Sequence, residues 1–80
     1  MTRGEAMRSW GHVYTAADLG RFLARAREEQ GLTQQALADQ LGVSRRYLSE
    51  IENGKPGLFT ERLFQAMRLL DVRLTAERGR

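Results

Sequence analysis

The sequence predicts a small, mainly α-helical domain of four helices followed by a C-terminal β-strand. Apolar residues recur at helical spacing in four segments, and three of these segments follow a Thr or Ser that can cap a helix. Near the C-terminus the period changes to the strict alternation that is typical of a strand. A chain of 80 residues makes one domain, whose modest core is often completed by oligomerisation.

The composition narrows the classes of partner and site. The chain has no cysteine, which fits a reducing cytosol and excludes disulfides and thiolate metal sites, and we expect no metal or cofactor. No apolar run is long enough to span a membrane and the N-terminus lacks the apolar stretch of a signal peptide, so we expect a cytoplasmic protein without membrane contact. Twelve of the 13 cationic residues are arginine, whose planar fork suits phosphates and guanine edges. An anionic partner or a merely solvated basic surface would both explain this excess.

The N-terminal part divides into an arm and a first helix. Residues 1–14 show no helical periodicity and are predicted to form a mobile arm, with His12–Tyr14 as a candidate extended piece. Thr15 and Asp18 have the spacing of a capping box, which predicts a helix over residues 16–30 that ends at Gly31.

Two short helices with a tight turn between them are predicted next. Thr33 caps the first, Gly42 ends it, and Ser44 caps the second, which should run to about Glu52. Ala38 is small where the two helices would cross. This pattern describes a helix-turn-helix motif, and the polar face of its second helix is the face that would enter a DNA major groove.

The last part contains a helix and a strand. The helix should start near Thr60 and bury four apolar residues, Leu63, Phe64, Met67 and Leu70. Residues 72–80 then form a strand and tail, so residues 15–71 make up the helix-turn-helix domain. Val72, Leu74 and Ala76 would form an apolar strand face that pairs with its own copy in a homodimer. A competing interpretation is that His12–Tyr14 supplies the missing strand within the same chain.

The segment TQQALADQLGVSRRYLSEIENGK resembles the helix-turn-helix of the phage-repressor (Xre/Cro) superfamily. The flanking stretches VYTAADLGRFLARAREEQGLTQ and LLDVRLTAE are similar to those of HipB-type antitoxins. This resemblance implies a phage-repressor-like fold, a homodimer on an inverted-repeat operator in double-stranded DNA, and a HipA-type kinase toxin as partner. The protein would then be found at its operator on the nucleoid.

The resemblance also implies roles for individual residues. Those that would read base edges are Arg45, Arg46, Glu50, Ser44 and Tyr47, and those that would hold phosphates are Gln34, Ser49, Asn53 and Lys55. An acidic Glu50 among the readers departs from many relatives, and it could instead orient Arg46, one turn earlier. The superfamily commonly pairs residues at the positions of Arg27 and Glu52, which we expect to form a structural ion pair; two exposed charges are the alternative.

Three functions are therefore compared. The leading one is a repressor that acts as the antitoxin of its own operon; the next is a stand-alone phage- or plasmid-type repressor without a toxin. A third, of another class, is a protein-interaction module that no longer binds DNA, which Arg45 and Arg46 on the reading helix argue against. We do not expect an enzyme, because the chain has no cysteine nucleophile, and His12, the only histidine, cannot complete an oriented triad by itself. Trp10 fits either an anchor for the arm or a protein contact.

Overall fold

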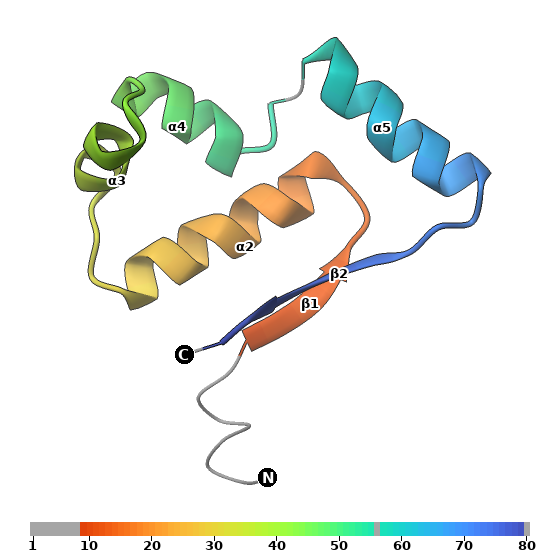
Figure 1. The fold of residues 1–80 in the computed structure, drawn as a ribbon, viewed down its shortest axis with the longest axis horizontal. Helices are drawn as coiled ribbons and strands as arrows, with labels where there is room; N and C mark the ends of the chain where they lie inside the picture. The colour runs from red at the N-terminus through yellow and green to blue at the C-terminus, as the bar shows by residue number, and fades with distance from the viewer. Residues whose placement is uncertain (1–8, 56, 80) are drawn as a thin grey trace, which may run out of the picture.

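A computed structural model describes residues 9–79 except residue 56. The described residues form four helices and two strands, which confirms the predicted mainly helical fold with a C-terminal strand and adds a strand at the N-terminal side. Figure 1 shows α2 in the middle, with the α3–α4 pair on one side of it and the two strands on the other. In chain order the elements are β1 (Ser9–Val13), α2 (Ala16–Glu29), α3 (Gln34–Leu41), α4 (Arg45–Glu52), α5 (Leu58–Leu69) and β2 (Leu74–Arg78).

The start of α2 is fixed by the predicted capping box. The Asp18 backbone N–H donates to Thr15 Oγ1 at 3.1 Å, and Asp18 Oδ2 accepts from the backbone N–H groups of Tyr14 at 2.8 Å and Thr15 at 3.1 Å. These bonds satisfy N–H groups that have no partner inside the helix. The hydrogen bond from the Tyr14 N–H is the main cause that lowers the pKa of Asp18. The capping box thus sets the direction in which the chain passes from β1 into α2.

The turn between α3 and α4 is built as the sequence predicts. Gly42 adopts a left-handed conformation with φ of 73°, which costs glycine little. Thr33 and Ser44 accept hydrogen bonds from backbone N–H groups in the first turns of α3 and α4. Ala38 is 0% exposed, so the two helices approach closely at this position. The turn and the caps together fix the angle at which α4 is held.

Two further glycines bring α4 and the loop after it against α2. At Gly20 an added Cβ would overlap the carbonyl oxygens of Ile51 and Glu52 at the end of α4. At Gly54, whose φ is 70°, an added Cβ would overlap the backbone of Ala17. Sequence reasoning missed both contacts, because a glycine within a helical pattern carries no mark of what lies opposite it.

The C-terminal end of α5 corrects the predicted strand. The Asp71 N–H donates to the Arg68 carbonyl, the Val72 N–H donates to the Met67 carbonyl, and Asp71 has φ of 57°. This is the Schellman arrangement that closes a helix. Val72 therefore belongs to the helix end, and the strand begins at Leu74 rather than at Val72.

The two strands form an antiparallel pair within one chain. Their register places Val13 opposite Leu74, Gly11 opposite Ala76 and Ser9 opposite Arg78. Up to residue 8 the predicted arm lies outside the described residues. Its next residues, Ser9–Val13, form β1, which includes His12 and Val13 of the predicted extended piece. The physical reason is that the pairing satisfies backbone groups that a lone strand would leave open. The structure thus contains the within-chain pairing that the sequence left as an alternative to pairing with a second copy.

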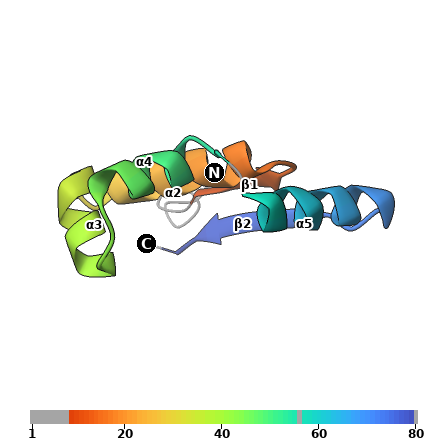
Figure 2. The ribbon, with the colours of Figure 1, turned by 90° about the horizontal axis from the view of Figure 1, so that it is seen from above.

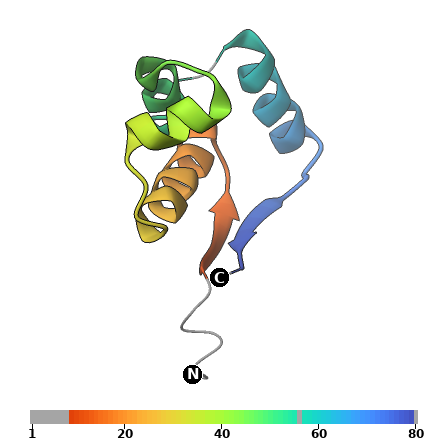
Figure 3. The same ribbon diagram turned by 60° about the vertical axis from the view of Figure 1, so that its left-hand side comes forward.

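The core is small, and α5 contributes little to it. The buried apolar side chains among the described residues are Val13, Ala38, Leu48 and Phe64. Leu63 and Leu70 were expected in the core but are exposed, because α5 packs against the rest through Phe64. The molecule is flat, with principal dimensions of 37 × 36 × 15 Å. Figures 2 and 3 show α5 at one side of the molecule, apart from the α3–α4 pair.

Candidate nucleic-acid interface

Helix α4 presents one face to the core and the opposite face to solvent. Leu48 is buried, and so is Glu52 one turn later, and these two residues hold the inner face. Arg45, Arg46 and Tyr47 are all exposed in the first turn. A helix that is held on one side and carries two exposed arginines at its N-terminal end has the form needed to enter a major groove.

The expected base-reading residues are held in different ways. The Ser44 hydroxyl accepts a hydrogen bond from the Tyr47 N–H at 3.0 Å, so this side chain caps α4. Glu50 Oε2 lies 3.7 Å from Arg46 Nε and 3.8 Å from Lys55 Nζ. Glu50 therefore faces two cations, and this geometry favours its alternative role, in which it orients Arg46.

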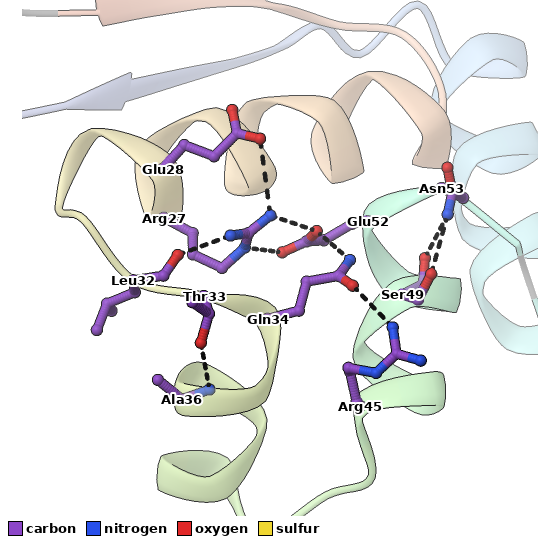
Figure 4. Close-up of polar contacts among 10 residues, drawn as sticks. All are labelled: Arg27, Glu28, Leu32, Thr33, Gln34, Ala36, Arg45, Ser49, Glu52 and Asn53. Carbon is purple, nitrogen blue, oxygen red and sulfur yellow. Dashed lines mark hydrogen bonds and ion pairs between the residues drawn. The ribbon is translucent and has the colours of Figure 1, made fainter.

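Ser49 and Asn53, two of the expected phosphate ligands, lie together at the end of α4. Asn53 Nδ2 donates to the Ser49 carbonyl at 2.8 Å and approaches its hydroxyl at 3.3 Å (Figure 4). These bonds hold the end of α4. Lys55, in the loop that follows, is exposed and lies beside Glu50 rather than in this pair of contacts. The structure thus brings Ser49 and Asn53 together at the end of α4.

Arg27 and Glu52, the expected ion pair, are brought together between α2 and α4 (Figure 4). Arg27 Nε lies 2.7 Å from Glu52 Oε2, and Arg27 Nη2 lies 3.2 Å from Oε1. The two side chains are only 10% and 5% exposed. Arg27 Nη1 also donates to the Leu32 carbonyl at 2.7 Å, which ties in the loop before α3. A bidentate pair of this kind is much stronger than an ion pair between exposed charges.

The pKa values of the pair shift as this geometry requires. The hydrogen bonds from Arg27 are the main cause that lowers the pKa of Glu52, and burial acts against them. The same hydrogen bonds raise the pKa of Arg27. Both groups are therefore charged in the folded protein near neutral pH.

Gln34, another expected phosphate ligand, joins this pair to the first turn of α4. Gln34 Nε2 donates to Glu52 Oε1 at 2.8 Å, and Gln34 Oε1 accepts from Arg45 Nη1 at 3.5 Å (Figure 4). Gln34 is also the first residue of α3, where the backbone N–H groups have no partner within the helix. Sequence reasoning placed Gln34 at the DNA but missed its contacts with Glu52 and Arg45, which connect residues far apart in the chain.

These features place the chain in a defined class of proteins. Residues 18–79 match the family described as "Helix-turn-helix domain", and the chain belongs to this family.

A curated relative points the same way. The chain is 34% identical over 58 residues to the "Uncharacterized HTH-type transcriptional regulator y4mF" of Sinorhizobium fredii (strain NBRC 101917 / NGR234). The match covers 72% of this chain and 76% of the relative. No solved structure matches the chain at a significant level. In the described part of the chain, no helix is long and apolar enough to cross a membrane.

Proposed function

We propose that this protein is a sequence-specific repressor that reads double-stranded DNA with α4. The observation that carries the proposal is the pair Arg45 and Arg46, exposed on a helix whose other face is fixed by buried Leu48 and Glu52. Arginine binds the O6 and N7 atoms of guanine through two hydrogen bonds in the major groove. Glu50 then orients Arg46, and Ser44 and Tyr47 line the same face.

Groups on both sides of α4 would hold the DNA backbone. Lys55, Ser49 and Asn53 lie at its C-terminal end, and the N-terminus of α3 with Gln34 lies beside its first turn. A helix N-terminus favours anions through its free N–H groups. Phosphate contacts at both ends of α4 would fix its register in the groove, while base contacts set the sequence preference.

The repressor would act as a homodimer formed through an apolar stripe on α5. This stripe consists of Phe59, Leu63, Ala66 and Leu70, which lie at helical spacing beside the buried Phe64 and are all exposed. The described residues bury few side chains and leave this apolar surface in contact with water. Packing against a second copy of the chain would bury it. Because β2 already pairs with β1, we assign the main dimer contact to this stripe rather than to the strand face of Val72, Leu74 and Ala76.

A twofold dimer would present two copies of α4 to the DNA. Half-sites would then lie about 34 Å apart or at a multiple of this spacing, so the operator should be an inverted repeat. The resemblance of the flanks to HipB-type antitoxins supports a role as the antitoxin of its own operon, paired with a HipA-type kinase toxin in the cytoplasm. The curated relative, a transcriptional regulator by name, fits a stand-alone repressor equally well.

The test of DNA reading is a selection from a pool of randomised duplexes with the full chain. We expect enrichment of an inverted repeat, and a binding constant that falls steeply as salt rises, since phosphate contacts release counterions. Binding with no sequence preference would contradict the proposal. Absence of binding at low salt would favour the protein-interaction module.

The test of the dimer compares two neighbouring residues. Leu70 is 73% exposed and belongs to the stripe, whereas Leu69 is 79% exposed and lies about 100° away around the helix axis. Leu70→Glu should yield monomers in sedimentation, and Leu69→Glu should leave the dimer intact. Equal behaviour of the two variants, or a monomeric parent protein, would contradict the stripe as the interface.

The test of the antitoxin role starts from the neighbouring gene. If that gene encodes a kinase of the HipA type, the two purified proteins should form a complex and bind the operator upstream of both genes. If the neighbour encodes no such protein, or the purified pair does not associate, a stand-alone repressor is the better assignment.

A further inference from the structure

We infer that Gln34 and buried Glu52 are positioning residues that set how Arg45 reads DNA. This inference rests on the proposed function and deepens it, because it assigns one determinant of sequence preference to side chains that lie behind the recognition helix. Its basis is a chain of polar contacts that runs from Arg27 through Glu52 and Gln34 to Arg45 (Figure 4).

The orientation of the Gln34 amide follows from chemistry. Glu52 is an ionised carboxylate that can only accept hydrogen bonds. Its oxygens accept from Arg27 and from Gln34 Nε2, so the NH₂ group of Gln34 must face Glu52. The Gln34 oxygen is then directed away from Glu52 and toward the N-terminal turn of α4, where it accepts from Arg45 Nη1.

Arg45 therefore depends on α3 for its orientation, whereas Arg46 depends on its own helix. Arg46 lies 3.7 Å from Glu50, four residues later on α4, and has no contact with Gln34. The contact between Arg45 and Gln34 is long at 3.5 Å, so it biases the direction of the guanidinium and leaves it able to reach a base. Pre-orienting a flexible side chain in this way lowers the entropy lost on binding.

The same geometry specifies what replacement of Glu52 would do. In Glu52→Gln the new amide has one acceptor oxygen, while three N–H donors, two from Arg27 and one from Gln34, converge on the position. The new NH₂ group should take the place of Oε1, because at the place of Oε2 it would face the shorter of the two Arg27 contacts, 2.7 Å against 3.2 Å. At Oε1 it meets Gln34 Nε2, and the Gln34 amide can remove this conflict by rotating, which turns its own NH₂ group toward Arg45 and releases Arg45.

The test measures base preference at each operator position for the full chain and three variants. Arg45→Ala identifies the position that Arg45 reads. Gln34→Met keeps the length of the side chain but removes both hydrogen bonds, and should reduce discrimination at that same position by about two- to tenfold, the worth of one hydrogen bond. Discrimination at the position read by Arg46 should not change. In the double variant Gln34→Met/Arg45→Ala, the loss at this position should equal that of Arg45→Ala alone, because the two residues act through one contact.

Each other result overturns the inference in a recognisable way. If Gln34→Met lowers affinity for all sequences equally and adds to Arg45→Ala, Gln34 only holds a phosphate, and the proposed reading by α4 stands. If Arg45→Ala itself changes no base preference, the reading role of Arg45 falls together with the inference. Glu52→Gln, measured where circular dichroism shows a folded protein, should reduce discrimination at the same position as Gln34→Met. If the folded Glu52→Gln protein keeps the base preference of the parent, Glu52 has no part in positioning Arg45.

Discussion

Removal of Glu52 should be the most damaging change to a single charged side chain in the described part of this protein. Glu52→Ala would leave the Arg27 guanidinium enclosed between α2 and α4 without its carboxylate partner. Breaking a buried pair by removing one member costs about 3–5 kcal/mol, because the remaining charge is desolvated and unpaired. A domain of 80 residues is expected to have a free energy of unfolding of about 4–12 kcal/mol. The loss is therefore a large share of the total, and should lower the melting temperature by roughly 12–40 °C.

Glu28→Ala is a matched control. Glu28 also faces Arg27, with its carboxylate 3.8 Å from Arg27 Nη2, but its side chain is 68% exposed. Its removal should change the free energy of unfolding by less than about 0.5 kcal/mol. The assay is urea denaturation of both variants, of Arg27→Ala and of the double variant Arg27→Ala/Glu52→Ala. A coupling free energy near zero between Arg27 and Glu52, or equal losses for the Glu52 and Glu28 variants, would refute the stabilising role of this ion pair.

Three further outcomes are expected. The pKa of Glu52 is lowered in the fold, so the stabilisation that its carboxylate provides is complete above the ordinary pKa of 4.5 and is lost as the pH falls through the lower folded-state pKa. Glu52→Gln should therefore reduce the dependence of the unfolding free energy on pH between about 5 and 3, as measured by denaturation. Gly20→Ala should lower the free energy of unfolding by about 1–3 kcal/mol, because the new Cβ would overlap backbone carbonyls of α4. Gly11→Ala, where the space is open, should not lower it, and equal effects of the two changes would contradict the close approach of α2 and α4. When binding to a panel of operators is measured, Arg46→Ala should cost roughly 1–3 kcal/mol of binding free energy and relax the base preference at one position per half-site. Lys55→Ala should weaken binding to all sequences about equally, and a uniform loss for Arg46→Ala would make Arg46 a phosphate ligand.

The local features of the fold could be predicted because each depends on a few adjacent residues. The capping box at Thr15 and Asp18, the left-handed Gly42 and the caps at Thr33 and Ser44 are short-range chemistry, and the structure contains all of them. The crossing at Ala38 was also predictable, because a helix-turn-helix requires a small residue there.

The parts that could not be predicted depend on residues far apart in the chain. The pairing of Ser9–Val13 with Leu74–Arg78 could be raised only as an alternative for His12–Tyr14, because polar residues and glycine in the N-terminal segment weaken the alternation of a strand. The burial expected for Leu63 and Leu70 followed from helical periodicity, which shows that a face is apolar but not what covers it. The same holds at the site. Sequence placed Gln34 and Arg45 near DNA, but only the fold places Glu52 behind Gln34.

The central claim is that the exposed face of α4, and not positive charge in general, reads the operator. Its most direct test is the affinity of two double variants with equal net charge for a selected operator and for a scrambled duplex. Arg45→Ala/Arg46→Ala removes two arginines from α4, and Arg25→Ala/Arg68→Ala removes two exposed arginines, one from α2 and one from α5. We expect the α4 variant to lose its preference for the operator over the scrambled duplex, and the control variant to keep it. Equal loss of preference in both variants, or a preserved preference in the α4 variant, would contradict the account.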